Sequence, residues 1–170
     1  YPLHIFADAE ASKYADGSAW HSYGGHVSEL DYINKMAPDK SIYFTEASIG
    51  TWIGDGTWNG VLKSCILNDF EHNFLGVLSR NGSGVIMWNL MLDQDRKPFR
   101  PGGCSTCFGA VQINNGTYSY ESLEYSSHYY DIAHCSKVVK AGAKRIKSSG
   151  YTADGLTYEA FLNPDGSYAV

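Results

Sequence analysis

The pattern that most constrains the fold is an alternation of short apolar runs with longer amphipathic segments. The short runs are rich in aromatic and β-branched residues, which is typical of strands buried under helices. The longer segments carry apolar residues at the i, i+3, i+4 spacing of helices. The predicted strands are 18–23, 41–45 and 85–90, and the predicted helices are 27–36, 61–79 and 122–137. Because strands and helices alternate, the pattern predicts an α/β fold with a parallel sheet.

The remaining segments follow other patterns. Residues 81–84 (Asn-Gly-Ser-Gly) predict a turn, and 93–115 has no periodicity. Residues 144–146 and 155–170 are strand-like, with a predicted hairpin turn at 163–166. About three βα units therefore lead into β structure, which is less than half of an eight-stranded barrel of roughly 250 residues.

Polar side chains gather at the ends of the predicted strands. In parallel α/β sheets functional groups lie at the carboxyl ends of the strands, where His21, Tyr23 and Glu46 are found. Glu46 ends a strand that we expect to be buried, which makes it the first candidate for a catalytic carboxylate. The simpler alternative is a carboxylate that only reaches the surface at that point.

Aromatic rings accompany this carboxylate. Trp52, Trp58 and Trp88 fall in loops or strand ends on the same predicted rim. A single tryptophan is more often part of a core than a ligand platform. Three of them beside a carboxylate favour a sugar ligand, because sugar CH faces stack on aromatic rings and sugar hydroxyls find hydrogen-bond partners.

The cysteines indicate a disulfide rather than a metal site. Cys104 and Cys107 are separated by two residues, but no second cysteine pair or histidine pair at zinc spacing accompanies them. We therefore expect a local disulfide in an irregular loop. Cys65 and Cys135 lie in predicted helices and are expected to be small buried residues, with a bridge between them left open.

Two further patterns concern modification and cofactors. Asn81-Gly-Ser and Asn115-Gly-Thr fit the N-glycosylation acceptor pattern and favour a secreted protein, although such triplets also arise by chance. The sequence has no phosphate-binding glycine loop and no nucleophile elbow, and its histidines form no obvious ligand set. We therefore expect neither a cofactor nor a metal.

Composition and charge exclude several classes of protein. With 44% hydrophobic and 14% aromatic residues, the chain is not of the disordered class. A net charge of −5 argues against a nucleic-acid partner. The sequence has no uncharged apolar stretch of about 18 residues, so we expect no membrane span. It starts at Tyr1 without a signal-peptide pattern and stops in a strand-like run at 167–170, so we expect a piece of a longer protein.

Taken in order, five segments resemble glycoside hydrolase family 30, the family of glucosylceramidases and β-1,6-glucanases. They are SAWHSYGG, SIYFTEASIG, GVIMWNLMLD, PGGCSTCFGAV and YYDIAHCSKVVKAGAKRI. The similarity covers roughly residues 15–150, and the following tail is similar to the family's appended β-sandwich. The GGCSTC stretch is closer to the microbial β-1,6-glucanases than to the animal glucosylceramidases.

The resemblance implies roles for particular residues. Glu46 corresponds to the family's catalytic nucleophile, His21 and Tyr23 to the adjacent sugar subsite, and Trp88 to the glucose pocket. Three further residues are expected to bind substrate: Trp20, Trp52 and Asn89. The family's acid/base is a second Glu on an earlier barrel strand, for which this sequence has no counterpart. A retaining glycosidase needs both carboxyl groups about 5–5.5 Å apart, so we expect the isolated chain to be inactive and poorly stable.

The implied organisation is the C-terminal part of a (β/α)8 TIM barrel at 1–140 and the truncated start of an all-β sandwich domain at 141–170. The implied activity is retaining hydrolysis of β-1,6-glucan by a secreted enzyme. The implied partners of this chain are that glucan and the N-terminal half of the same enzyme. Glucosylceramide, cleaved in the lysosome, and β-1,4-xylan are the alternative substrates. An inactive, lectin-like carbohydrate-binding module is the competing hypothesis, and a fragment with no role of its own is the third.

Overall fold

A computed structural model of the chain divides into two compact units. The residues that it describes are 1–114, 116, 119–148 and 156–170. The first unit consists of Tyr1–Glu46, Glu71–Ile86 and Val138–Val170, and the second of Ala47–Phe70 and Met87–Lys137. Helices and sheets occur in both units, so the predicted mixture of α and β structure is confirmed.

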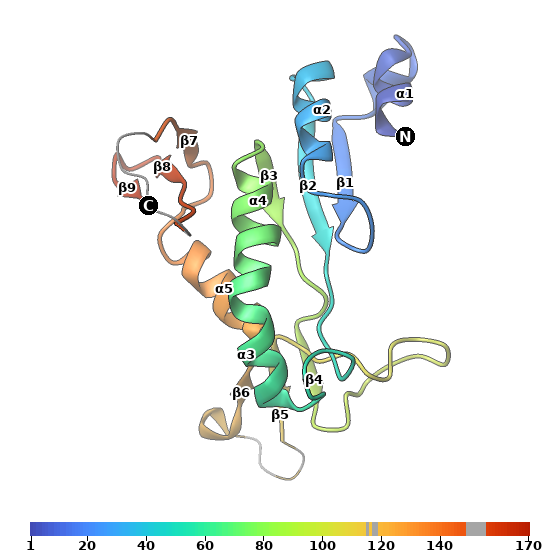
Figure 1. The fold of residues 1–170 in the computed structure, drawn as a ribbon, viewed down its shortest axis with the longest axis vertical. Coiled ribbons are helices and arrows are strands. Elements are labelled where there is room, and N and C mark those ends of the chain that lie inside the picture. The colour runs from blue at the N-terminus through green and yellow to red at the C-terminus, as the bar shows by residue number, and fades with distance from the viewer. Residues whose placement is uncertain (115, 117–118, 149–155) are drawn as a thin grey trace. The chain divides into compact units, whose positions relative to one another are not determined.

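The first unit contains a parallel three-stranded sheet with the order β1-β2-β3 (Figure 1). Its strands are β1 (Gly17–His21), β2 (Ser41–Glu46) and β3 (Gly82–Val85). The first two match the predicted strands. Ile42 and Phe44 of β2 are buried while Tyr43 between them is exposed, because alternate residues of a strand point to opposite faces. The parallel pairing follows the predicted alternation of strands and helices.

Helices precede and connect these strands. They are α1 (Pro2–Ala7), the 3-10 helix η1 (Ala11–Tyr14) and α2 (Glu29–Met36). Leu30 and Ile33 are the buried residues of α2, as its spacing predicts. Glu29 and Asp31 lie in its first turn and Lys35 in its last. At these positions their charges interact favourably with the helix dipole.

The third strand lies earlier in the chain than predicted. The expected turn at 81–84 and strand at 85–90 are wrong, since β3 is Gly82–Val85. A Cβ on Gly82 would meet the carbonyl oxygen of Val77 at 2.8 Å, and one on Gly84 would meet the Tyr43 ring at 3.3 Å. The glycines therefore allow β3 to approach its neighbours closely. A pattern of apolar residues does not indicate this effect, so it did not predict the position of the strand.

The long helix begins three residues earlier than predicted, and it includes a π-helical segment. It consists of α3 (Trp58–Asp69), the π-helical segment η2 (Phe70–Leu75) and α4 (Gly76–Leu78). Thr57 caps α3, because its Oγ1 accepts a hydrogen bond from the Gly60 N–H at 3.1 Å. The start of the helix is thus set by a capping residue rather than by the first residue of the apolar pattern, Val61.

The C-terminal strands form an antiparallel sheet with the order β7-β8-β9. They are β7 (Lys144–Ile146), β8 (Ala160–Leu162) and β9 (Tyr168–Ala169). The predicted turn at 163–166 is confirmed, with the Gly166 N–H donating to the Asn163 carbonyl at 3.0 Å. Buried Asn163 also accepts from the Lys140 N–H and donates to the Val138 carbonyl, each at 2.9 Å. The turn is therefore tied to the segment that precedes β7.

The second unit has a three-stranded sheet with the order β4-β5-β6 and two helices packed side by side, α3 and α5 (Figure 1). Its further elements are β4 (Met91–Asp93), β5 (Val111–Ile113), the 3-10 helix η3 (Tyr120–Ser122), β6 (Glu124–Tyr125) and α5 (Ser127–Ser136). The helix predicted over 122–137 is thus shorter, and 93–115 is not wholly irregular. The core contains Ile49, Val61, Cys65 and Phe108.

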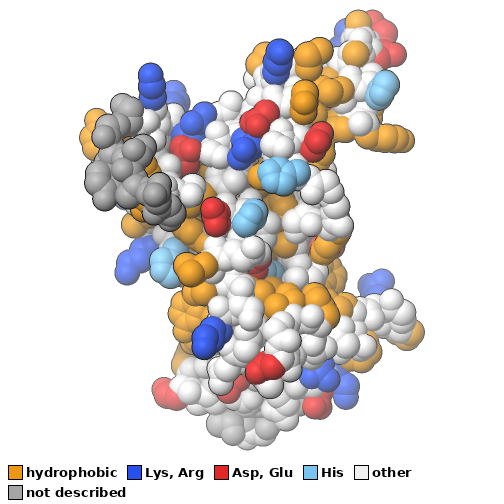
Figure 2. All heavy atoms as spheres, in the orientation of Figure 1, with side chains coloured by type: hydrophobic (Ala, Val, Ile, Leu, Met, Phe, Trp, Pro, Cys, Tyr) orange, Lys and Arg blue, Asp and Glu red, His pale blue; other side chains and the backbone are white. Residues whose placement is uncertain are grey.

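Two further features of the structure are the distribution of its charged side chains and the hydrophobicity of its helices. Figure 2 shows Lys and Arg side chains interspersed with Asp and Glu on the face in view, rather than gathered by sign. Within the described part of the chain, no helix has the length and hydrophobicity needed to cross a bilayer.

Candidate active site

The end of β2 places Glu46 beside His21 of β1. Along the parallel pair Trp20 is opposite Phe44, but His21 is opposite Glu46, so Thr45 is one extra residue in β2. Such a bulge re-aims the side chains that follow it. The Thr45 hydroxyl donates to the Trp20 carbonyl at 3.3 Å, which helps to hold this irregularity.

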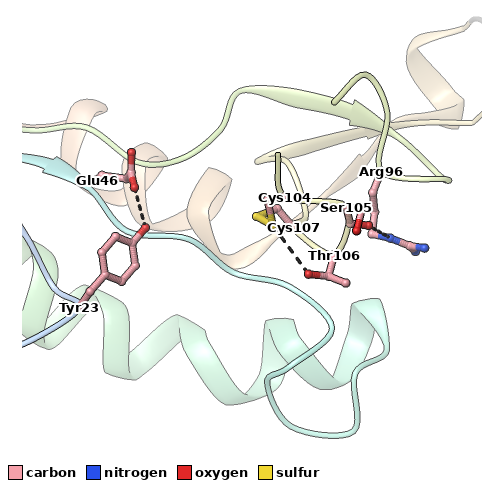
Figure 3. Close-up of a disulfide and its surroundings, with 7 residues drawn as sticks. All are labelled: Tyr23, Glu46, Arg96, Cys104, Ser105, Thr106 and Cys107. Carbon is pink, nitrogen blue, oxygen red and sulfur yellow. Dashed lines mark hydrogen bonds between the residues drawn. A yellow bond between two sulfur atoms is a disulfide. The ribbon is translucent and has the colours of Figure 1, made fainter. Parts of the chain in front are cut away.

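Tyr23, in the loop after β1, contacts both of these residues. Its hydroxyl donates a hydrogen bond to Oε1 of Glu46 at 3.0 Å, as Figure 3 shows. Its ring meets the His21 ring edge-on, with centroids 5.7 Å apart and an interplanar angle of 82°. Tyr23 is 60% exposed and Glu46 is half-buried. The first unit therefore presents a carboxylate of fixed orientation, flanked by two aromatic rings and open to a ligand.

Trp20 lies in a different environment from this group. Its indole N–H donates to Ser18 Oγ at 2.8 Å, and the side chain is half-buried. It lines two hollows of about 350 and 360 Å³ together with Tyr1 and Pro2. The residues that line these hollows do not include Glu46. The structure thus brings His21 and Tyr23 to the carboxylate but places the Trp20 ring against the α1 side of β1.

The other expected substrate-binding residues belong to the second unit. Trp88 is 45% exposed, and its N–H donates to the Ala47 carbonyl at 2.9 Å. The Asn89 carbonyl accepts from the Ala110 N–H at 2.8 Å. Its side-chain Oδ1 is buried and has no hydrogen-bond partner among the described residues. Backbone hydrogen bonds thus fix both residues, while the Trp88 ring remains accessible.

The two remaining tryptophans differ sharply. Trp52, in the loop between Glu46 and α3, is 53% exposed. Trp58 packs against the core cluster, with its ring edge-on to Phe108 at a centroid distance of 5.3 Å. The expectation that Trp58 lies in a loop or at a strand end is therefore wrong, since it is the first residue of α3, while a place for this half-buried ring on a sugar-binding rim stays a prediction.

The expected disulfide is present. Cys104 and Cys107 are bonded to each other, and Figure 3 shows the turn that they close, with Cys104 Sγ 3.7 Å from Thr106 Oγ1. Cys65 and Cys135 are free thiols, so the bridge left open between them does not form. Cys65 is buried as expected, whereas Cys135 is only partly so.

The two glycosylation candidates have different outcomes. Asn81 is exposed, with a left-handed φ of 60° that is typical of asparagine in turns. Its side chain donates to Asn34 Oδ1 at 3.3 Å and accepts from Arg145 Nη2 at 3.0 Å. Asn115 lies outside the described residues.

The second unit also buries ionisable side chains that the sequence patterns did not single out. His128 and Asp131 of α5 are 0% and 1% exposed, and His128 Nε2 lies 3.4 Å from Oδ2 of Asp69 on α3. Burial, with the charge of Asp69, raises the pKa of Asp131 to about 8. Burial and both aspartates raise the pKa of the Cys65 thiol to about 11. The available signal was the i, i+3 spacing of His128 and Asp131, which places both on one helix face.

Metal binding has no geometric support in the described residues, where no three His, Cys, Asp or Glu side chains converge on one point. The group at Glu46 has one carboxylate, one phenol and one imidazole. Such a set suits nucleophilic or hydrogen-bonding contact with a polar organic ligand.

Comparisons with known proteins agree with this chemistry. The model of the glycosyl hydrolase family 30 β-sandwich domain matches residues 142–170. The endo-1,6-β-D-glucanase neg1 of Aspergillus fumigatus is 34% identical over 169 residues, which are 95% of this chain and 31% of the relative. The putative glucosylceramidase 2 of Caenorhabditis elegans is 31% identical over 175 residues, covering 98% of this chain and 31% of the relative.

A solved structure gives the same result. The endo-β1,6-glucanase BT3312 is 50% identical, with a TM-score of 0.90 over 99% of this chain and 36% of that protein. The chain spans about a third of the length of the curated relatives it matches. The resemblance drawn from the five segments is therefore confirmed: over nearly its whole length, the chain is related to the enzymes of glycoside hydrolase family 30.

Proposed function

We propose that this chain is the C-terminal part of a retaining β-glycoside hydrolase that cleaves β-1,6-glucan, with Glu46 as its nucleophile. The observation that carries the proposal is the hydrogen bond from Tyr23 to Oε1 of Glu46, at 3.0 Å, at the carboxyl ends of β1 and β2. The glucanases among the relatives support the substrate class. The proposal includes the division into a partial (β/α)8 barrel at 1–140 and the start of a β-sandwich domain at 141–170.

The proposed mechanism is a double displacement. The ionised Glu46 attacks the anomeric carbon and forms a glycosyl ester, while a second carboxylic acid protonates the departing glycosidic oxygen. That second group then takes a proton from water, which attacks the anomeric carbon and releases Glu46. The proposal assigns the second group to a Glu outside residues 1–170. Tyr23 holds one oxygen of Glu46, which limits rotation of the carboxylate before the attack.

The remaining residues have binding roles in this proposal. His21 and Tyr23 line the subsite of the attacked sugar, and Trp88 offers an exposed ring for stacking. Asn89 is kept in the proposal as a substrate contact through its place beside Trp88, although its Oδ1 is buried. Trp52 offers a second exposed ring in the second unit, whereas Trp20 would contribute indirectly, through the backbone next to His21.

A glucosylceramide substrate is the second candidate, because one relative is named as a putative glucosylceramidase. The Cys104–Cys107 disulfide supports an oxidising location, such as the outside of the cell, for either substrate. A lectin-like module without turnover, β-1,4-xylan as substrate and glycosylation at Asn81 stay as predictions. Rates of hydrolysis on β-1,6-glucan, glucosylceramide and β-1,4-xylan would separate the candidates.

The test uses the full-length protein that contains this chain. Glu46→Gln should lower kcat on the best of the three substrates by at least about 10³-fold, with an unchanged circular dichroism spectrum. Glu71→Gln, which removes an exposed carboxylate on η2, is the matched control and should retain activity. Undiminished turnover in Glu46→Gln would overturn the assignment, and binding without turnover in the unaltered protein would favour the lectin-like module.

A further inference from the structure

Trp52 is an exposed ring between two anchored neighbours. The Thr51 N–H donates to the Thr106 carbonyl at 3.0 Å, and the Ile53 N–H donates to the Gly50 carbonyl at 3.1 Å. The Ile53 side chain packs against the core cluster. The backbone on both sides of Trp52 is therefore fixed, although its ring is 53% exposed.

Gly50 leaves the space that this ring occupies. A Cβ at Gly50 would collide with the six-membered part of the Trp52 ring, approaching Cη2 to 2.6 Å, and would also collide with the Thr106 carbonyl oxygen. The ring therefore lies directly over the Gly50 backbone. Any side chain at this position would displace the ring, the Thr106 segment or both.

The disulfide holds the segment on the other side. Cys107 is buried and forms an antiparallel bridge with Gly50, and the Phe108 N–H donates to the Ile49 carbonyl at 2.8 Å. The Cys104–Cys107 bond ties the more exposed end of the turn to this anchored end. The Thr106 carbonyl, which accepts from Thr51, lies inside the closed turn.

We propose that Gly50 and the disulfide-closed turn Cys104–Cys107 are positioning elements that hold Trp52 as a stacking platform for a glucose unit of the glucan. A ring whose backing and flanking backbone are fixed loses little freedom when a sugar stacks on it, so its contribution to binding is larger than that of a mobile ring. The inference rests on the proposed function, since the ligand is its substrate. It adds residues that act through Trp52 and do not touch the sugar themselves.

The experiment measures kinetics and binding separately in the full-length protein. Gly50→Ala and Cys104→Ala are each expected to raise KM for a β-1,6-linked gluco-oligosaccharide about five- to tenfold, while kcat changes less than about twofold. Cys135→Ala removes a free cysteine, leaves the disulfide intact and is the matched control. Calorimetric titration of the same oligosaccharide into these variants in a Glu46→Gln background gives the affinity without turnover.

A double variant distinguishes positioning from a general loss of structure. If Gly50 acts through the ring, Gly50→Ala combined with Trp52→Ala should raise KM no further than Trp52→Ala alone. Normal KM and affinity in Gly50→Ala and Cys104→Ala would overturn this inference while leaving the proposed function intact. The same holds for a fall in kcat and thermal stability without a change in KM. Absence of both hydrolysis and binding in the unaltered protein would overturn this inference and the proposed function together.

Discussion

The buried carboxyl of Asp131 should make the stability of this protein fall as pH rises. Its pKa is about 8 in the folded chain against an ordinary 3.8, because burial and then the charge of Asp69 disfavour the ionised form. Between about pH 4 and pH 8 the folded chain therefore holds a proton that the unfolded chain has lost. The free energy of unfolding must decrease with pH across this window and level off above it.

The size of the effect follows from the same two values. A full proton of difference lowers the free energy of unfolding by about 1.4 kcal/mol per pH unit. Relaxation and water entry reduce this limit for a buried carboxylate, so we expect a total of about 2–3 kcal/mol between pH 5 and pH 8. Asp131→Asn carries no titrating carboxyl and should lose this component. It should therefore gain stability relative to the unaltered protein as pH rises.

The assay is urea unfolding of the full-length protein, followed by tryptophan fluorescence at pH 5, 6, 7 and 8. The measured quantity is the difference in unfolding free energy between Asp131→Asn and the unaltered protein. His128 and Asp69 are present in both, so the slope of this difference isolates Asp131. Asp39→Asn, at an exposed position after α2, is the control for the removal of a carboxyl that is not buried. A difference in unfolding free energy that has no slope with pH, or that falls with pH, would refute the reasoning. A rising difference that is shifted by the same amount at all four pH values would not, since that shift reflects packing of the amide.

Three further predictions concern the site and the sheet. Tyr23→Phe should lower kcat/KM on β-1,6-glucan about 10- to 100-fold, because it removes a hydrogen bond to a carboxylate; unaltered kinetics would contradict the role of Tyr23. The purified 170-residue chain should release no reducing sugar from that glucan, and measurable release would place the second carboxyl group within it. Gly17→Ala should lower the free energy of unfolding by about 1–3 kcal/mol in denaturant titrations, since its Cβ would reach the Ser41 carbonyl carbon at 2.9 Å. Gly24→Ala, whose Cβ meets no atom within 4 Å, is the comparison, and equal losses in the two would count against the packing argument.

The elements that sequence patterns predicted well are those whose periodicity comes from burial. β2 has buried Ile42 and Phe44 on either side of exposed Tyr43, and α2 buries Leu30 and Ile33. β3 was placed too late because its position depends on how closely two glycines approach their neighbours. Glycine contributes nothing to a hydrophobic pattern, so the pattern favoured the apolar run that follows β3.

The candidate site was predictable in its residue types but not in its geometry. His21, Tyr23 and Glu46 could be named because they follow strands, and the resemblance gave them roles. The bulge at Thr45 that sets Glu46 opposite His21 leaves no mark in the sequence. Trp58 could not be placed from the sequence either, since composition does not distinguish a tryptophan in a loop from one that begins a helix and packs on the core.

The hydrogen bonds of Asn163 bear on where this chain could be divided. The family match begins at residue 142, yet the Asn163 amide binds the Val138 carbonyl and the Lys140 N–H upstream of that point. A shortened protein that started at 142 would leave this buried amide without two of its partners, at a cost of about 1–3 kcal/mol for each unpaired group. One that started before Val138 would keep the upstream segment and the hairpin as a single piece. For anyone expressing the β-sandwich separately, the working boundary is therefore several residues ahead of the one that sequence similarity marks.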